Sequence, residues 1–225
     1  MTGQPDAEEF AELALDLHDV PFEETVERVL EFAVKALNCA YAGVILVHAG
    51  GRVETVAATH PVVAELDAIQ MECGQGPDLE VIADRHGVLI RDAEADERWP
   101  QWSGRVVAAG IRSMLGTRLY TTRNTIGSLN FYDHEPDRFD GADVDVAHML
   151  ARHAAVAMES ARGAENLWKA IDARNLIGQA QGILMERFGV DADQAFGVLR
   201  RYSQDNNVRL HVVAERLIAT RRLPG

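Results

Sequence analysis

Residues 167–218 read LWKAIDARNLIGQAQGILMERFGVDADQAFGVLRRYSQDNNVRLHVVAERLI, and this stretch decides the fold of the C-terminal part of the chain. Proline is absent from 137–223, so the chain can be helical throughout this region. A first helix is expected to stop at Gly189, because glycine readily adopts the left-handed conformation that ends helices. Asp191 and Gln194 have capping-box spacing at the start of a second helix. With a third helix after it, the stretch predicts a small three-helix unit.

Apolar residues at helical spacing mark the inner faces of the second and third helices. The second helix is expected to end at the polar run 205–207. Its predicted inner stripe comprises Ala195, Phe196, Leu199 and Ser203, and that of the third helix comprises Leu210, Val213, Ala214, Leu217 and Ile218. A core this small predicts support from the preceding helix or from a dimer partner.

Two glycines interrupt the first helix. Gly178 and Gly182 are four residues apart and therefore share one face, and each costs about 1 kcal/mol relative to alanine. One interpretation is close packing against a neighbouring helix. The other is a smooth patch on which a base or sugar lies, flanked by Arg174, Gln179 and Gln181.

Residues 167–218 closely resemble the ANTAR domain over about fifty residues with matched spacing. The resemblance implies RNA binding by a dimer, with the bound RNA prevented from forming a transcription terminator. The matching features are Arg174, Ile177, Ala180, Gly182, Leu184–Met185, Ala195–Phe196, Leu199–Arg200, Ser203, Asn207, Leu210 and Ala214. The expected RNA contacts are Arg174, Gln179, Ala180, Gln181, Gly182, Arg200, Ser203 and Arg209.

The chain departs from that family at Gln181, where lysine is common, which removes a charge from the expected binding face. Candidate phosphate contacts that remain are Arg187, Arg200, Arg201 and Arg209, each of which is otherwise a solvated surface residue.

A seam of small residues leads into this region from about Gly141. Spacings of four and three residues along a continuous helix favour a parallel coiled-coil dimer, since the stripe continues beyond the preceding domain. The alternative is a helix packed on its own domain. The seam comprises Leu150, Ala154, Ala157, Ala161, Ala164, Trp168 and Ile171.

The part of the chain before the seam is predicted to be mixed α/β. Helices are expected over 6–20 and 22–38, followed by short β-branched runs separated by helices and loops. This order favours an antiparallel sheet with helices on its faces. The expected strands are 42–47, 52–58, 87–91, 112–119 and 126–132.

This part also resembles a GAF domain over roughly residues 23–160. The resemblance implies a six-stranded antiparallel sheet, a sensory role and, often, dimerisation through the terminal helices. Asp78 stands where many relatives carry cysteine, which argues against a thiol-based sensor there. The matching elements are Gly74–Pro77, Asp92, Arg98–Trp99–Pro100, Gly110–Ser113 and Gly127–Tyr132.

The fold class expected for the whole chain is therefore α/β. A GAF-like sensor domain at 1–160 leads through a long helix into an ANTAR-like bundle at 161–225. Residues 1–165 carry a net charge of −16 and residues 166–225 a net charge of +3, so only the C-terminal part suits a polyanion. The acidic N-terminus lacks the features of a signal peptide, and no apolar run is long enough to span a bilayer, which predicts a cytoplasmic protein.

The function expected from these features is that of a dimeric sensory regulator, not an enzyme. It binds hairpins that overlap terminators in nascent RNA, and a small-molecule signal of unidentified kind acts through the GAF-like domain. No catalytic motif and no metal-spaced cluster of histidine and cysteine is found. Two alternatives stay open: a DNA-binding regulator with a ligand-sensing domain, and a protein-interaction module, which the low charge of +3 favours.

Overall fold

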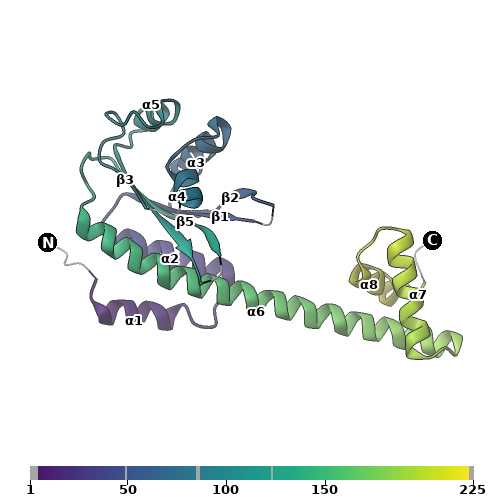
Figure 1. The fold of residues 1–225 in the computed structure, drawn as a ribbon. Coiled ribbons are helices and arrows are strands. Elements are labelled where there is room, and N and C mark those ends of the chain that lie inside the picture. Colours follow the sequence, from purple (N-terminus) through teal and green to yellow (C-terminus); the bar gives the residue numbers. More distant parts are fainter. Residues whose placement is uncertain (1–4, 49, 85–86, 123, 223–225) are drawn as a thin grey trace. The chain divides into compact units, whose positions relative to one another are not determined.

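The chain forms two compact units, unit 1 at Met1–Arg162 and unit 2 at Gly163–Gly225. Each unit has its own hydrophobic core. The computed structural model describes residues 5–48, 50–84, 87–122 and 124–222 (Figure 1).

Unit 1 is built on an antiparallel sheet with strand order β2-β1-β5-β4-β3. All five predicted strands are confirmed, with small shifts at their ends. Among the described residues the sheet has five strands, so the expected sixth is wrong: the segments between β2 and β4 form helices and turns around the short β3. The strands are β1 (Tyr41–Val47), β2 (Val53–Ala58), β3 (Val88–Ile90), β4 (Ser113–Tyr120) and β5 (Thr125–Asp133).

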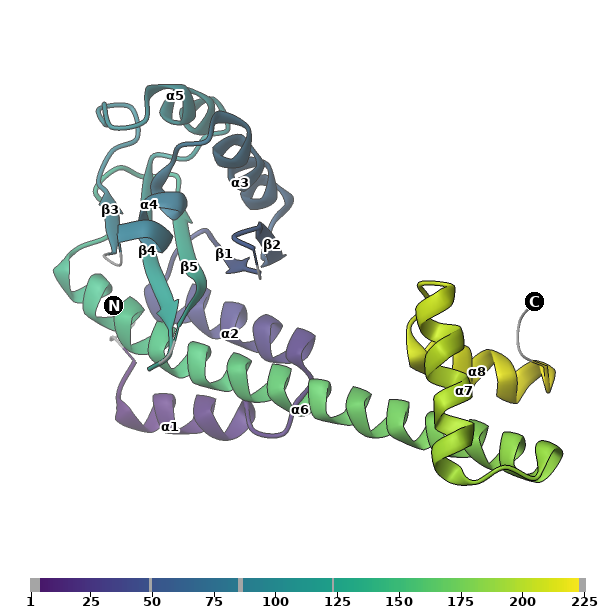
Figure 2. The same cartoon turned by 45° about the vertical axis from the view of Figure 1, so that its right-hand side comes forward.

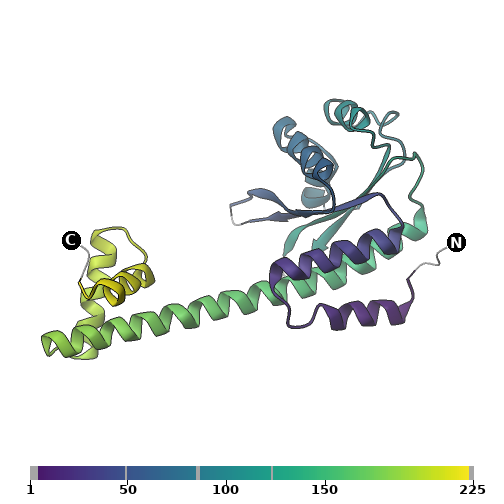
Figure 3. The same cartoon turned by 180° about the vertical axis from the view of Figure 1, so that it is seen from behind.

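One face of the sheet is covered by α2 (Phe22–Leu37) and by the first part of α6 (Gly141–Phe188) (Figure 1). The helix α1 (Ala7–Asp16) lies beside these two helices on the side away from the sheet (Figures 2 and 3). It begins at Asp6, whose carboxylate accepts hydrogen bonds from two backbone amides of the first turn. The apolar stripe of α2 fills the core beneath, as its spacing predicts.

The predicted seam residues along α6 are buried in unit 1 and exposed beyond it. Leu150 and Ala154 are buried in the core of unit 1, so for these two residues the predicted dimer seam is wrong. Alanines at helical spacing allow close approach to any apolar surface, and here α1, α2 and the sheet supply that surface. Farther along, Trp168 and Ile171 remain 65% and 39% exposed.

The opposite face of the sheet is covered by α3 (Pro61–Cys73) and α4 (Pro77–Asp84), with α5 (Pro100–Ala108) packed beside α3 (Figure 1). Proline stands at the start of α3 and of α5, where a backbone N–H would have no partner within the helix, so its absence costs no hydrogen bond. Trp102 and Tyr132 are the largest fully buried side chains of this second core.

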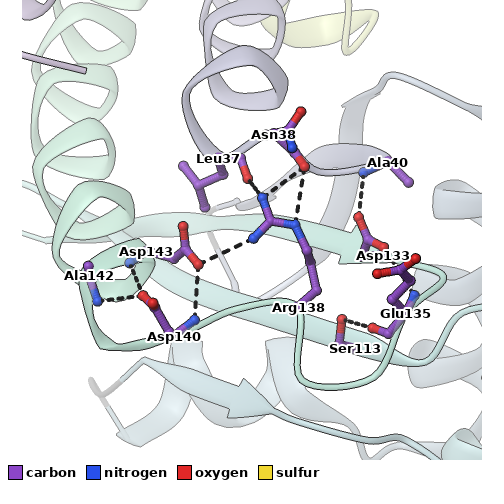
Figure 4. A network of polar contacts seen from close by, with 10 residues as sticks. All are labelled: Leu37, Asn38, Ala40, Ser113, Asp133, Glu135, Arg138, Asp140, Ala142 and Asp143. Carbon is purple, nitrogen blue, oxygen red and sulfur yellow. Dashed lines mark hydrogen bonds and ion pairs between the residues drawn. The ribbon is translucent and has the colours of Figure 1, made fainter. Parts of the chain in front are cut away.

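A single arginine joins the end of α2 to the start of α6 (Figure 4). The Arg138 guanidinium donates to the carbonyls of Leu37 and Asn38 and contacts Asp143 at 3.5 Å. Asp140 caps α6 by accepting from the backbone amides of Ala142 and Asp143 at 2.8 and 3.0 Å. The first turn of α6 is thereby fixed to the turn that precedes β1.

Replacing Arg138 with alanine should lower the free energy of unfolding of unit 1 by about 2 kcal/mol, because two carbonyls lose a charged donor. Urea unfolding measures the change. Arg91→Ala is the matched control, since the Arg91 guanidinium makes an exposed 3.5 Å ion pair with Asp137, and its loss should change stability by less than about 1 kcal/mol. Equal effects of the two substitutions would contradict the role given to Arg138.

Unit 2 consists of the end of α6 with α7 (Ala192–Asp205) and α8 (Leu210–Thr220). The predicted stop at Gly189 and the capping box of Asp191 and Gln194 are confirmed. The predicted inward position of Phe196 is wrong: it is 37% exposed, because Ala195 and Leu199 already fill the inner face of α7. The buried core comprises Ala180, Leu184, Ala195, Leu199, Val213, Ala214 and Leu217.

Candidate nucleic-acid interface

The two glycines of α6 lie on an open face. A Cβ at Gly178 or at Gly182 would meet no atom of the described residues within 4 Å, and both residues are exposed. Helical periodicity places them opposite Ala180 and Leu184, which are buried against α7 and α8. Packing against another helix of this chain therefore does not explain the glycines.

Three of the predicted contacts are used inside unit 2. Ala180 is fully buried, so its side chain cannot touch RNA, which corrects that part of the prediction. The Gln181 amide donates to the carbonyl of Ala192 at 3.0 Å and holds the start of α7. The Ser203 hydroxyl donates to the carbonyl of Val208 at 2.6 Å and closes the turn before α8.

The other predicted side chains are exposed and lie on two helices and at the start of the third. Arg174 and Gln179 lie on α6, Arg200 lies on α7, and Arg209 immediately precedes α8. Arg174 precedes Gly178 by four residues and so flanks the same face of α6. Sequence reasoning missed Asn175, which is exposed and stands three residues before Gly178 and seven before Gly182. That spacing alone could have identified it.

No cluster of three or more His, Cys, Asp or Glu side chains suited to a metal occurs in the described ranges. Nor does any described helix have the length and hydropathy needed to cross a bilayer. Burial raises the pKa of the free Cys39 thiol to about 12, which keeps it protonated and unreactive.

Unit 1 contains a buried polar cluster between β5 and the helices α3 and α4. Asp67 accepts hydrogen bonds from the hydroxyls of Thr55 at 2.7 Å and Tyr132 at 3.2 Å. Asp78 accepts from the amide of Gln70, whose carbonyl in turn accepts from the Asp78 backbone N–H at 2.8 Å. The sequence gives no signal for this cluster, because its members are spread over four elements.

The glycine-rich turn between α3 and α4 is shaped around this cluster. Gly74 has φ of 65°, and a Cβ at Gly76 would overlap the side chain of Gln70. The turn can therefore bring Gln70 and Asp78 together only because a side chain is missing at Gly76.

Burial gives Asp67 an acid-dependent effect on stability. Desolvation raises its pKa from 3.8 to about 6, so the folded state holds the proton more tightly than the unfolded chain. The resulting stability is complete below the unfolded pKa and is lost as pH rises through about 6. Wild type should therefore be about 2 kcal/mol more stable at pH 4.5 than at pH 7.5 from this group.

Urea unfolding at a series of pH values measures this difference, with Asp67→Asn as the comparison. The variant should lose the added stability at low pH. A wild-type stability that falls steadily as pH drops from 7.5 to 4.5 would contradict the assignment.

Comparison with known families agrees with both units. Residues 19–159 match the GAF domain, which is more than half of the chain, so the protein belongs to the GAF domain family. Residues 165–218 match the ANTAR domain, so the protein combines a GAF domain with an ANTAR domain. Both are regulatory domains: the first implies ligand sensing, and the second implies RNA binding in antitermination. A comparison with curated proteins found no match.

Solved structures share the fold of unit 1 at low sequence identity. The GAF domain of an Acinetobacter phosphoenolpyruvate-protein phosphotransferase has a TM-score of 0.56 at 15% identity, covering 71% of this chain and 97% of that one. The corresponding domain from Coxiella burnetii has a TM-score of 0.55 at 14% identity, covering 69% and 94%. Free methionine-R-sulfoxide reductase from Neisseria meningitidis has a TM-score of 0.53 at 17% identity, covering 68% and 88%.

Proposed function

We propose that this protein is a signal-responsive regulator that binds hairpins in nascent RNA through unit 2 and promotes read-through of a terminator. The observation that carries the proposal is the open glycine face of α6. Gly178 and Gly182 each destabilise the helix by about 1 kcal/mol, and no neighbour within the described chain occupies the space they leave. A ligand from outside the chain accounts for that cost, and an RNA base or sugar can lie against bare backbone.

The charges of unit 2 support a nucleic-acid ligand in particular. Arg174 flanks the glycine face, and exposed arginines also stand on α7, at Arg200, and just before α8, at Arg209. Guanidinium groups form bidentate hydrogen bonds with phosphate and stack on bases. The net charge of −16 over residues 1–165 leaves unit 2 as the part of the chain that suits a polyanion.

The active form in this proposal is a homodimer joined along α6 beyond unit 1. Trp168, Ile171 and Leu167 are exposed by 39–65%, and aromatic side chains of that size are typical of interface anchors. A dimer presents two copies of unit 2, which suits an RNA with paired hairpins.

In this proposal a change at the buried polar cluster of unit 1 is transmitted to α6 through β5. Tyr132 belongs to the buried polar cluster, and the next residue, Asp133, accepts a hydrogen bond from the Ala40 backbone N–H at 3.1 Å. The turn from Asn38 to Ala40 is also held by Arg138, which contacts Asp143 in the first turn of α6 (Figure 4). A change in the cluster thereby reaches the helix that carries unit 2.

Transcription by purified polymerase through a two-hairpin leader and terminator tests this function. Added wild-type protein should raise the read-through fraction several-fold, and a leader with scrambled hairpin loops should not respond. A DNA-binding regulator would instead change initiation at the promoter and leave the read-through fraction unchanged.

A further inference from the structure

Two carboxyl groups are buried in unit 1 around the same tyrosine. Asp67 on α3 is 1% exposed, Asp78 on α4 is fully buried, and both act on Tyr132 of β5. Burial, and after it the charges of the two carboxyls, raises the pKa of Tyr132 well above its ordinary value, so its hydroxyl stays protonated. None of the described ion pairs includes Asp67 or Asp78. Two negative charges in one dry cluster disfavour each other, so one carboxyl is expected to keep its proton.

The described cations around α4 are engaged elsewhere. This helix packs against α3, β3, β4 and β5. Arg118 is on the face of β4 that Gly116 turns toward α4, but its guanidinium stacks on the Tyr120 ring at 4.3 Å. Two further arginines form ion pairs with other carboxylates, Arg98 with Asp96 at 2.6 Å and Arg105 with Glu72 at 2.7 Å. The other ionisable side chains on α4 and the elements packed against it include Asp67, Cys73, Glu80 and Tyr132, none of which carries positive charge.

Hydrogen bonding assigns the proton to Asp78 rather than to Asp67. Asp67 accepts from two hydroxyls, those of Thr55 and Tyr132, and such donors stabilise the charged form of a carboxyl. Asp78 accepts from the Gln70 amide through Oδ2, but no donor among the described residues reaches its Oδ1. The carboxyl with fewer donors is the one that keeps the proton.

The surroundings of the free Asp78 oxygen agree with this assignment. Oδ1 of Asn130 also lacks a donor, and a Cβ built at Gly116 would lie 3.7 Å from the Asp78 oxygen and 3.4 Å from the Asn130 oxygen. A proton on Asp78 allows its carboxyl to donate to Asn130, which satisfies both side chains. Burial, and after it the charge of Asp67, raises the pKa of Asp78 well above its ordinary value.

The turn before α4 provides a hinge by which Asp78 can leave the cluster. Gly74 and Gly76 have φ of 65° and 156°, and a Cβ at Gly76 would overlap the side chain of Gln70. Asp78 stands in the first turn of α4, where the helix dipole favours a carboxylate in contact with water. A neutral Asp78 is therefore stabilised inside the cluster, and an ionised one is stabilised outside it.

We propose that Asp78 holds a proton while α4 is closed over the sheet, and that loss of this proton to solvent frees the start of α4. Unit 1 is then a switch that opens as pH rises. The closed form binds the proton more tightly than the open form, so closure is favoured at low pH and is lost as pH rises through the pKa of the buried carboxyl. This inference rests on the sensory role proposed for unit 1 and names the proton as its signal.

Infrared spectroscopy of the full chain detects the proton directly, because the C=O stretch of a neutral carboxyl is separate from the bands of a carboxylate. At about pH 7.5 exposed carboxyls are ionised, so wild type should show the band of one buried neutral carboxyl. The band should disappear as pH is raised further. Asp78→Asn should lack it, whereas Glu80→Gln, which removes a partly exposed carboxyl from the same helix, should retain it.

Hydrogen exchange over α4, measured by mass spectrometry and corrected for the intrinsic effect of pH, follows the opening. Protection in wild type and in Glu80→Gln should fall up to about tenfold for each pH unit above the point at which the band disappears. Protection in Asp78→Asn should stay constant, because the new amide takes the place of the neutral carboxyl as a donor to Asn130.

A wild-type protein without the band at pH 7.5 would overturn the proposal, and the Asn130 amide would then be reversed to donate to an ionised Asp78. This result needs no variant and so does not depend on how Asp78→Asn folds. A band that survives in folded Asp78→Asn, or protection of α4 that stays constant in wild type while the band disappears, would overturn it equally. Neither measurement involves RNA, so RNA binding by unit 2 is judged separately.

Discussion

Replacing Gly182 with glutamine is expected to weaken RNA binding by roughly 100-fold, a loss of about 3 kcal/mol. In the proposed complex a base or sugar lies against α6 at Gly182, and this space is open in the free protein. The glutamine side chain would occupy it. Glutamine is uncharged, so the loss would not come from repulsion of phosphate. Titration of a labelled two-hairpin RNA at fixed salt measures the affinity.

The same substitution should make the protein more stable. Glutamine favours the helix interior over glycine by about 0.5 kcal/mol, and at Gly182 its Cβ meets no neighbour. A substitution that disturbed packing would lower both the affinity and the stability. Lower affinity with higher stability therefore indicates that Gly182 belongs to a binding face. Gly104→Gln is the matched control: Gly104 is also exposed in a helix with open space around it, but in unit 1. It should leave RNA affinity unchanged, and a loss of affinity in both variants would refute the assignment.

Replacing Trp168 with glutamate is expected to raise the dimer dissociation constant at least about 1000-fold. Each protomer contributes one Trp168, and each indole withdrawn from water contributes several kcal/mol. Glutamate would also place like charges opposite one another across the seam. Sedimentation velocity over a range of protein concentrations measures the association.

The matched control for the dimer is Leu15→Glu on α1. Leu15 is 76% exposed, slightly more than Trp168, and it lies outside the seam. Its substitution should leave association unchanged. A wild-type protein that stays monomeric at high concentration, with and without RNA, would remove the dimer from the proposal.

The elements of the fold were predictable because each carries its own local pattern. The strand at Thr125–Asp133 and the capped helix at Ala192–Asp205 follow from β-branched runs and from the Asp191–Gln194 pair. The partner of a helix face was not predictable in the same way. Leu150 and Ala154 fit a dimer seam and a domain core equally well, and only the packed structure assigns them to the core of unit 1.

The candidate interface was predictable in part. Gly178 and Gly182 break the helical pattern in the sequence, and the structure leaves them open. The internal roles of Gln181 and Ser203 depend on turns that form only when three helices pack together. The cluster of Asp67 and Asp78 was likewise missed, because its members come from four elements that meet only in the packed structure.

Competition between a two-hairpin RNA and duplex DNA of matched length and charge, for the full-length wild-type protein, tests the central claim most directly. The account predicts saturable binding to the RNA, with the DNA competing only at far higher concentration and losing its effect as salt rises. Displacement of the RNA by an equal or lower concentration of DNA would contradict it.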